Sequence, residues 1–183
     1  MCQEQKNKIR KIFFKKRLNI SVDFAKDESE KICKKAIGYL KKKDNIRYVA
    51  LYYPINNEVS LDCLQRFLEK KNYQIFLPKI IDNHLKFGKF TKSNLANNTK
   101  ITKIIEPIET SNQLMDLIFC PLVTFDKNSH RIGMGGGFYD KLIEKYHKNN
   151  HQCQFIGLAY KEQFYNDLIP TEKFDQQLDL VIF

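Results

Sequence analysis

The sequence predicts a single-domain α/β protein in which a mostly parallel sheet is covered by helices on both faces. Short apolar stretches rich in β-branched and aromatic residues end at proline or glycine, as buried strands do. They alternate with stretches whose apolar residues recur at helical spacing. The chain of 183 residues is too short for two full domains with separate cores. We therefore expect residues 1–183 to form one three-layer αβα sandwich.

Two helices are expected before the first strand. The first covers residues 1–17 and is amphipathic, with apolar residues at helical spacing among basic ones. The second begins after Ser21, whose side chain is a favourable N-cap. The residues expected to face inward are Ile9, Ile12, Phe13 and Leu18 in the first helix, and Ala25, Ile32, Ala36, Ile37 and Leu40 in the second.

A β-α-β unit follows. Residues 46–53 form the first strand, which stops at Pro54. Residues 59–71 carry apolar side chains on one helical face, and residues 73–77 form a second strand that stops at Pro78. Ligands of such sheets bind at the carboxyl ends of the strands.

The rest of the chain continues the alternation. A hairpin strand at 84–90 precedes a polar surface segment at 91–103. The sequence leaves open whether this segment closes over the ligand-binding edge of the sheet. A buried strand at 116–120, a helix from near Gly137, and strands at 154–159 and 178–183 complete the fold.

Composition narrows the class of partner. Lys and Arg outnumber Asp and Glu by 31 to 21, and the net charge of +10 favours anions such as nucleic acid, phosphates or polycarboxylates. The five cysteines show neither disulfide nor zinc spacing. No segment has the length of a signal peptide's apolar region or of a membrane span, so we expect a cytoplasmic protein.

The segment from Arg131 to Asp140 carries the clearest chemical signal. It holds four of the seven glycines, between an apolar strand and an expected helix. Glycines let a backbone approach an anion and adopt positive φ, and N–H groups at a helix N-terminus attract phosphate. The pattern is neither a Walker A loop nor a dinucleotide fingerprint. The alternative is a flexible turn.

Charged residues elsewhere fit the same chemistry. Lys6 and Arg10 lie one helical turn apart, which suits polyphosphate and also plain solvation. Glu58 follows the first strand, where a carboxylate can accept hydrogen bonds from a ligand. Arg131 could stabilise charge on a transferring phosphoryl group, and Asp140 could hold Mg²⁺. A second metal carboxylate could come from Asp175 or Asp179 near the C-terminus.

Taken together, these segments resemble the 5-formyltetrahydrofolate cyclo-ligase family along nearly the whole chain. The specific part is RIGMGGGFYDKLI, which begins at Arg131 and follows a P-x-x-x-F-D block at 121–126. Met134 and Phe138 depart mildly from the family's commonest tyrosine. Further matches are Lys6-x-x-x-Arg10, Tyr53-Pro54 with Glu58-Val59, Leu77-Pro78-Lys79, and the run 156–163 with Pro170 and Asp175.

The resemblance implies a Rossmann-like αβα fold and an ATP- and Mg²⁺-dependent closure of 5-formyltetrahydrofolate to 5,10-methenyltetrahydrofolate. It implies that Lys6 and Arg131 are catalytic, that Tyr53 and Glu58 contact the folate, and that Asp140 and Asp175 bind Mg²⁺. The implied ATP site comprises Lys6, Arg10, Arg131, Gly133, Met134, Gly135, Gly136, Gly137, Phe138 and Tyr139. We expect a monomer whose substrate, 5-formyltetrahydrofolate, can carry a polyglutamate tail, with no membrane partner.

Two other functions remain open at this stage. The basic charge and the aromatic content also fit a nucleic-acid-binding module, although most aromatics lie within apolar strands. A sugar-phosphate or CoA-dependent transferase could use the glycines for its own anion. Folate binding would distinguish such a transferase from a 5-formyltetrahydrofolate cyclo-ligase.

Overall fold

The computed structural model describes residues 2–91, 95–97 and 105–183. The helices are α1 (Cys2–Leu18), α2 (Val22–Leu40), α3 (Asp62–Lys70), α4 (Phe138–Lys148) and the short 3₁₀ helix η2 (Lys161–Gln163). The strands are β1 (Tyr48–Ala50), β2 (Gln74–Ile81), β3 (His84–Lys89), β4 (Leu95–Asn97), β5 (Ile105–Pro107), β6 (Leu117–Cys120), β7 (Thr124–Phe125), β8 (Arg131–Ile132), β9 (Gln154–Leu158) and β10 (Leu180–Ile182).

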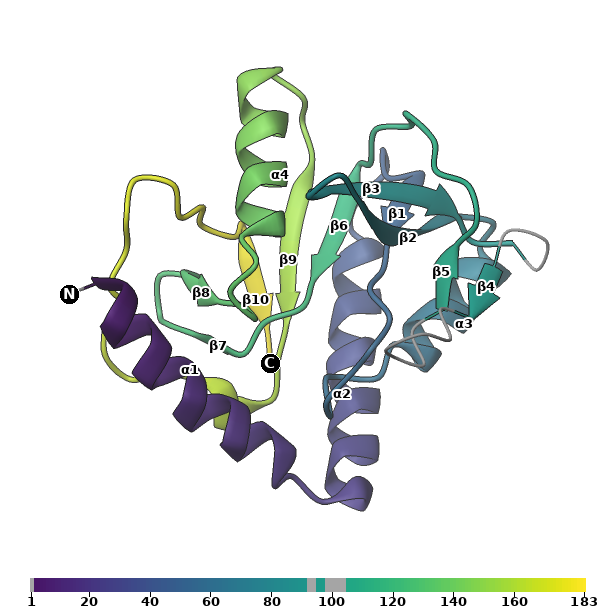
Figure 1. Ribbon diagram of the computed structural model, residues 1–183. Coiled ribbons are helices and arrows are strands. Elements are labelled where there is room, and N and C mark those ends of the chain that lie inside the picture. The colour runs from purple at the N-terminus through teal and green to yellow at the C-terminus, as the bar shows by residue number, and fades with distance from the viewer. Residues whose placement is uncertain (1, 92–94, 98–104) are drawn as a thin grey trace.

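The predicted mostly parallel sheet is confirmed. Six strands lie in the order β10-β9-β6-β1-β2-β3, and every neighbouring pair is parallel except the β2–β3 hairpin. Strands β4 and β5 form a separate antiparallel ladder, as do β7 and β8. Strands β1, β2 and β3 of the first half of the chain and strands β6, β9 and β10 of the second half lie in the same sheet and meet at the β1–β6 pair, so one sheet organises the fold (Figure 1).

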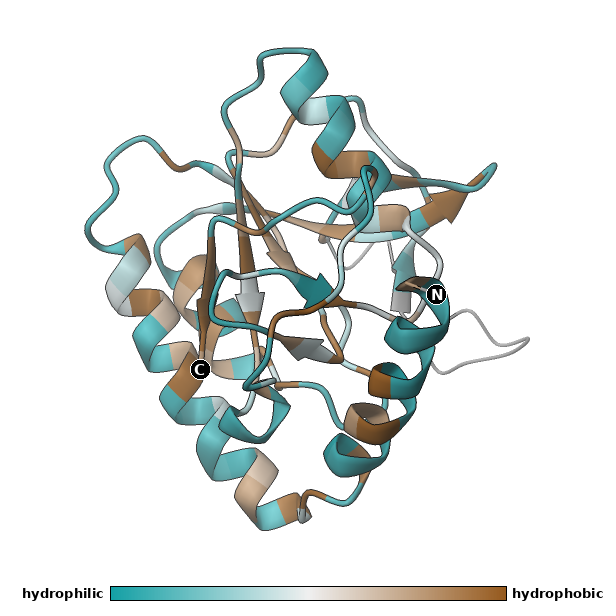
Figure 2. Cartoon of the chain, turned by 90° about the vertical axis from the view of Figure 1, so that its left-hand side faces the viewer, coloured by the Kyte–Doolittle hydropathy of each residue, from teal (hydrophilic) through white to brown (hydrophobic). Residues whose placement is uncertain are grey.

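Helices cover both faces of this sheet, as predicted. Helices α2 and α3 pack on one face, where Leu40 and Leu64 join Val49 of β1 in a buried cluster. Helix α4 packs on the other face, where Ile143 meets Ile118 of β6. Figure 2 shows the apolar strands enclosed between helices whose outer surfaces are mostly hydrophilic. Burial of apolar surface on both faces is what stabilises a parallel sheet.

Strands β1 and β2 differ most from their predicted bounds. Strand β1 covers three residues, although Leu51 still donates its N–H to the carbonyl of Phe76 at 2.9 Å. Strand β2 does not stop at Pro78 but runs on to Ile81. At Pro78 the strand pairs with Phe87 of β3, whereas its pairing with β1 ends at Phe76. A proline is tolerated there because one side of the strand needs no backbone N–H.

Helix α1 buries a different face from the one that its apolar residues predict. Phe13 is buried as expected, but Ile12 is 56% exposed and Leu18 is 47% exposed. The other two buried residues are Lys6 and Arg17. Helix α1 contacts β7 and η2 rather than the centre of the main sheet, so its inner face meets loops with polar groups (Figure 1). None of the described helices is both long and apolar enough to cross a bilayer.

Helix α2 follows the prediction closely. Ser21 accepts a hydrogen bond from the Phe24 N–H, and the inward residues Ala25, Ile32, Ala36 and Leu40 are buried. The predicted excursion at 91–103 lies largely outside the described residues, apart from Thr91 and strand β4. The ladder of β7 with β8 was not predicted, because strands of two residues carry no periodic signal.

Candidate functional site

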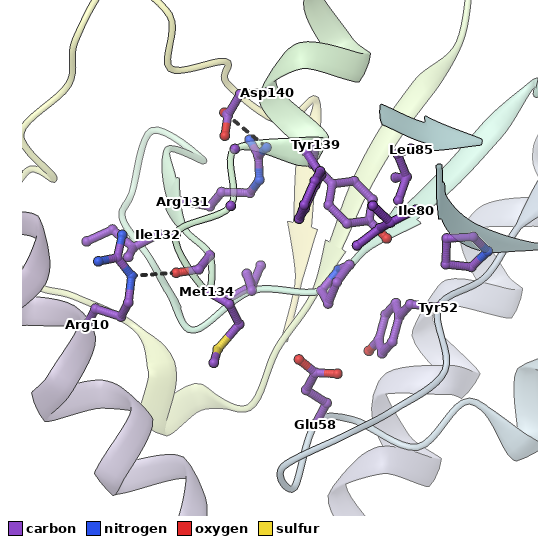
Figure 3. A pocket seen from close by; sticks show the side chains of 18 of the residues that line it. Arg10, Tyr52, Glu58, Ile80, Leu85, Arg131, Ile132, Met134, Tyr139 and Asp140 are labelled. Atoms are coloured by element: carbon purple, nitrogen blue, oxygen red, sulfur yellow. Dashed lines mark hydrogen bonds and ion pairs between the residues drawn. The ribbon is translucent and has the colours of Figure 1, made fainter. Parts of the chain in front are cut away.

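A cavity of about 340 Å³ lies at the carboxyl ends of β1 and β6. Its walls come from helix α1, the segment after β1, the β2–β3 hairpin, the segment between β8 and α4, and residues 174–175. This is the edge at which a parallel sheet places its ligands. Figure 3 shows side chains from these separate elements converging on one space.

The glycine-rich segment forms one wall and leads directly into helix α4. Gly137 is the N-cap of α4 and has φ 65°, while Gly135 has φ 101°. Both values are strained for residues with a side chain, so two of the four glycines are required by the backbone path. The first residues of α4, Phe138 to Asp140, line the cavity. The N–H groups of a helix's first turn have no partner within the helix, so this is a suitable place for an anion.

Two basic side chains brace this segment. Arg10 of α1 donates from Nε to the Gly133 carbonyl at 2.7 Å. Arg131 donates from Nη2 to the Asp140 carboxylate at 3.1 Å and from Nη1 to the Gln176 carbonyl at 2.5 Å. The Gln176 N–H in turn donates to Asp140 at 3.0 Å. The guanidinium of Arg131 is thus held rigidly beside the glycines (Figure 3).

Lys6 forms a charge cluster with two acidic residues. Its ammonium lies 2.6 Å from Asp175 Oδ2 and 2.9 Å from Glu172 Oε2, and its side chain is 6% exposed. Burial alone would lower the pKa of Lys6, but the hydrogen bonds and the charges of Asp175 and Glu172 outweigh it and raise the pKa above 10.5. Lys6 therefore stays protonated near pH 7, within a cluster that also holds the carboxyl groups of Asp175 and Glu172.

The opposite wall combines one carboxylate with an apolar surface. The Glu58 side chain is 7% exposed and accepts the Ile55 N–H at 3.1 Å. Burial raises the pKa of Glu58, and the charge of Arg17 opposes this rise. Tyr52 lies on the same side of the cavity as Glu58, and Ile80 and Leu85 line the cavity from the β2–β3 hairpin (Figure 3). This wall suits a flat ring with N–H donors at one edge.

Apart from the alternative metal ligand Asp179, every site residue predicted from the sequence lines this one cavity. The cavity-lining residues that were predicted are Lys6, Arg10, Tyr53, Glu58, Arg131, Gly133, Met134, Gly135, Gly136, Gly137, Phe138, Tyr139, Asp140 and Asp175. Their ligands and roles remain predictions. The sequence analysis missed Tyr52, Ile80, Leu85 and Phe174, which also line it. Ile80 and Leu85 are directly paired across the β2–β3 hairpin, a register that the assumed strand end at Pro78 concealed.

The two candidates for a second metal carboxylate lie at different places. Asp175 lines the cavity, whereas Asp179 accepts the Phe155 N–H at 2.7 Å where β9 and β10 begin. That is the amino end of the strands, so Asp179 is occupied in the fold. Within the described residues no three His, Cys, Asp or Glu side chains gather as a metal-binding group. A metal ion bound in the cavity would therefore also need oxygen atoms from water or from the molecule bound beside it.

Glycines and basic side chains in a cavity at the carboxyl edge of a parallel sheet are typical of α/β enzymes that act on phosphate-bearing ligands. The comparisons with known proteins specify the family. The model of the 5-formyltetrahydrofolate cyclo-ligase family matches residues 2–183. The chain belongs to the 5-formyltetrahydrofolate cyclo-ligase family, a group of folate-metabolising ligases.

Curated relatives and solved structures agree with this assignment. The chain is 34% identical to 5-formyltetrahydrofolate cyclo-ligase of Mycoplasma genitalium over 97% of its own length and 96% of the relative's. It is 29% identical to the Haemophilus influenzae enzyme of the same name, over 96% and 94%. A 5,10-methenyltetrahydrofolate synthetase structure from Mycoplasma pneumoniae superposes with a TM-score of 0.76 at 29% identity, covering 97% of both chains.

Proposed function

We propose that this protein catalyses the Mg-ATP-dependent cyclisation of 5-formyltetrahydrofolate to 5,10-methenyltetrahydrofolate, with ADP and phosphate as products. On this proposal the formyl oxygen accepts the γ-phosphoryl group of ATP, and N10 then attacks the activated carbon, loses its proton and expels phosphate. The observation that carries the proposal is the division of one cavity between a cationic glycine-lined wall and a wall with a buried carboxylate. Family membership supports the same reaction.

The cationic wall is assigned to the phosphates. Lys6, Arg10 and Arg131 supply positive charge from two directions, and the backbone from Gly133 to Tyr139 supplies N–H groups. Arg131 is already fixed by Asp140 and Gln176, so it can stabilise charge developing on the transferred group without reorganising. Lys6 is assigned the same role from the other side.

Asp140 and Asp175 are the residues that would hold Mg²⁺. The described contacts engage one oxygen of each carboxylate, Oδ1 of Asp140 and Oδ2 of Asp175, which leaves the second oxygen of each for a cation. Mg²⁺ is typically bound by one or two carboxylates together with substrate phosphates and water. When bound, Mg²⁺ would neutralise phosphate charge during transfer.

The opposite wall is assigned to the folate. The Glu58 carboxylate would accept hydrogen bonds from N–H groups of the pterin, with Tyr53 as a neighbouring contact. Placed there, the formyl group would face the glycine wall. The net charge of +10 would attract the glutamate moiety, including a polyglutamate tail.

Absorbance of the methenyl product tests the proposal. Purified protein is mixed with 5-formyltetrahydrofolate with and without Mg-ATP, beside an Arg131→Ala variant and a Lys141→Ala control on the exposed side of α4. We expect a rise that requires Mg-ATP, a loss of about 10²-fold or more in Arg131→Ala, and little change in the control. A flat trace from folded protein that still binds ATP would favour the transferase alternative.

A further inference from the structure

The turn that carries Glu58 is unusually well fastened. Asn56 and Asn57 both adopt left-handed φ values, 49° and 61°, and the Glu58 N–H closes the turn on the Ile55 carbonyl at 3.0 Å. The Glu58 carbonyl accepts the Tyr160 hydroxyl at 3.2 Å. Glu58 is therefore placed by its backbone before any side-chain contact is considered.

Arg17 at the end of α1 reaches the same turn from the other side. Its side chain is completely buried and donates from Nε to the Asn56 carbonyl at 3.1 Å and from Nη1 to the Leu122 carbonyl at 2.8 Å. Nη1 also lies 3.4 Å from Glu58 Oε1. Arg17 thus joins the segment after β1, the segment after β6 and the carboxylate of Glu58.

The side chain of Asn57 ties the turn to the backbone of α1. Its Nδ2 donates to the Arg17 carbonyl at 2.8 Å and to the Ile20 carbonyl at 2.9 Å. The Arg17 carbonyl, in the last turn of α1, also accepts the Ile20 N–H at 3.2 Å, so the Asn57 amide adds a second bond there and holds the residues just beyond the helix as well. The end of α1 and the turn therefore form one unit around Arg17.

Stability alone does not explain a buried arginine here. Its Nη2 has no hydrogen-bond partner among the described residues, and burial lowers the pKa of the Arg17 guanidinium. A buried, incompletely bonded cation costs free energy that an apolar side chain of similar size would not. The charged residue beside Arg17 is Glu58, which lines the cavity, whereas Arg17 does not.

We propose that Arg17 is a positioning residue that orients the Glu58 carboxylate toward the N–H groups of the bound pterin ring. The pterin presents two neighbouring N–H donors, and a carboxylate held in one orientation can accept both. This inference rests on the proposed folate substrate, and it adds a residue outside the cavity to the recognition of that substrate.

Arg17 also favours the charged form of Glu58. The groups facing Glu58 are Arg17 from α1, Tyr52 beyond β1, Tyr139 from α4 and Tyr160 beyond β9. Burial raises the pKa of each tyrosine, so these hydroxyls stay neutral near pH 7. Arg17 is then the charged side chain that opposes the burial-driven rise in the pKa of Glu58.

The sign of the expected pH effect follows from this arrangement. Without the charge of Arg17 the pKa of Glu58 rises further, so Glu58 takes up a proton at a higher pH than in the wild type. A protonated carboxyl cannot accept two N–H bonds as a carboxylate does. When the solution is acidified, folate binding weakens as Glu58 becomes protonated. In a variant that lacks the charge of Arg17, this loss should begin at a higher pH than in the wild type.

The test compares Arg17→Met and Arg17→Lys with a Lys15→Met control on the exposed face of α1. Dissociation constants for 5-formyltetrahydrofolate and for Mg-ATP are measured by calorimetry between about pH 5 and about pH 9, with circular dichroism to monitor folding. We expect Arg17→Met to bind folate about tenfold more weakly at neutral pH. The midpoint pH at which acidification weakens folate binding should be higher than in the wild type. Mg-ATP binding should change less than about threefold, and Arg17→Lys should restore the wild-type midpoint.

Other outcomes overturn the inference. A folded Arg17→Met protein with the wild-type midpoint and folate affinity would show that Arg17 does not act through Glu58, and equal loss of both ligands without a midpoint shift would show a purely structural role. If Arg17→Met does not fold, the polar but uncharged Arg17→Gln combined with Glu58→Gln gives the answer, because the inference requires their effects on folate affinity to be non-additive. Failure of the wild type to bind folate would refute the proposed function instead. Carboxyl NMR titration of Glu58 in the ligand-free wild type and in a folded uncharged variant of Arg17 would still test the charge effect.

Discussion

At the scale of single residues, backbone geometry separates glycines that look equivalent in the sequence. Gly135 has φ 101°, which residues with a side chain rarely adopt, although a Cβ there would make only ordinary contacts with Arg10. Gly133 has an ordinary φ and open space where its Cβ would lie. The repeated glycines of this segment therefore serve different purposes, and substitution distinguishes them.

We predict that Gly135→Ala weakens Mg-ATP binding by about tenfold, because a strained φ displaces the N–H groups of the segment. Gly133→Ala should stay within about threefold of the wild type, since it introduces neither strain nor a clash. Calorimetric titration of both variants with Mg-ATP measures the difference. Equal losses in the two variants would mean that φ at Gly135 is not what shapes this wall.

At the scale of elements, the β2–β3 hairpin is held against the segment that follows β5. Ser111 donates its N–H to the Phe87 carbonyl at 2.8 Å, and Lys79 donates to the Ile108 carbonyl at 2.8 Å. A Cβ on Gly88 would lie 2.1 Å from the Glu109 carbonyl oxygen. This close approach supports the hairpin whose Ile80 and Leu85 line the cavity.

Gly88→Ala is therefore expected to destabilise the fold by about 1–3 kcal/mol, because two backbones must separate. Gly38→Ala is the matched control: it lies in α2 with nothing within 4 Å of the added Cβ, and should stabilise by up to about 1 kcal/mol through helix propensity. Urea unfolding curves give both free energies of unfolding. A neutral Gly88→Ala would show that the two segments can part at no cost.

At the scale of the whole molecule, positive charge is in excess while the cavity is partly neutralised. Lys6 is paired with Asp175 and Glu172, and Arg131 is paired with Asp140. The excess positive charge that gives the chain its net charge of +10 thus lies outside these clusters. It acts on an anionic substrate through long-range electrostatic attraction rather than through direct contacts.

Because such a field is screened by salt, we predict that KM for 5-formyltetrahydrofolate rises several-fold between about 20 mM and about 0.5 M NaCl. The kcat should change less than about twofold, since the contacts in the cavity are at short range. Steady-state assays of methenyl product formation measure both constants, with sucrose as a control for osmotic effects. A constant KM would place recognition entirely in the cavity.

The sequence by itself determined the layered α/β architecture, the order of its main helices and strands, and several of the segments that line the cavity. These follow from local signals: periodicity reports helices and strands, proline and glycine mark ends, and the clustered glycines mark a special backbone. Membership of the family also rests on motifs in the sequence, such as the block from Arg131 to Asp140.

The tertiary structure alone decided which polar residues are buried and what they contact. Arg17 and Ile12 show this best. Hydrophobicity alone predicts a buried isoleucine and an exposed arginine, but the packing of α1 against polar segments buries Arg17 and leaves Ile12 exposed. Likewise Asp175 and Asp179 are equivalent in sequence, yet one lies in the cavity and the other at the amino end of the strands. Such assignments depend on partners more than twenty residues away, to which no local pattern is sensitive.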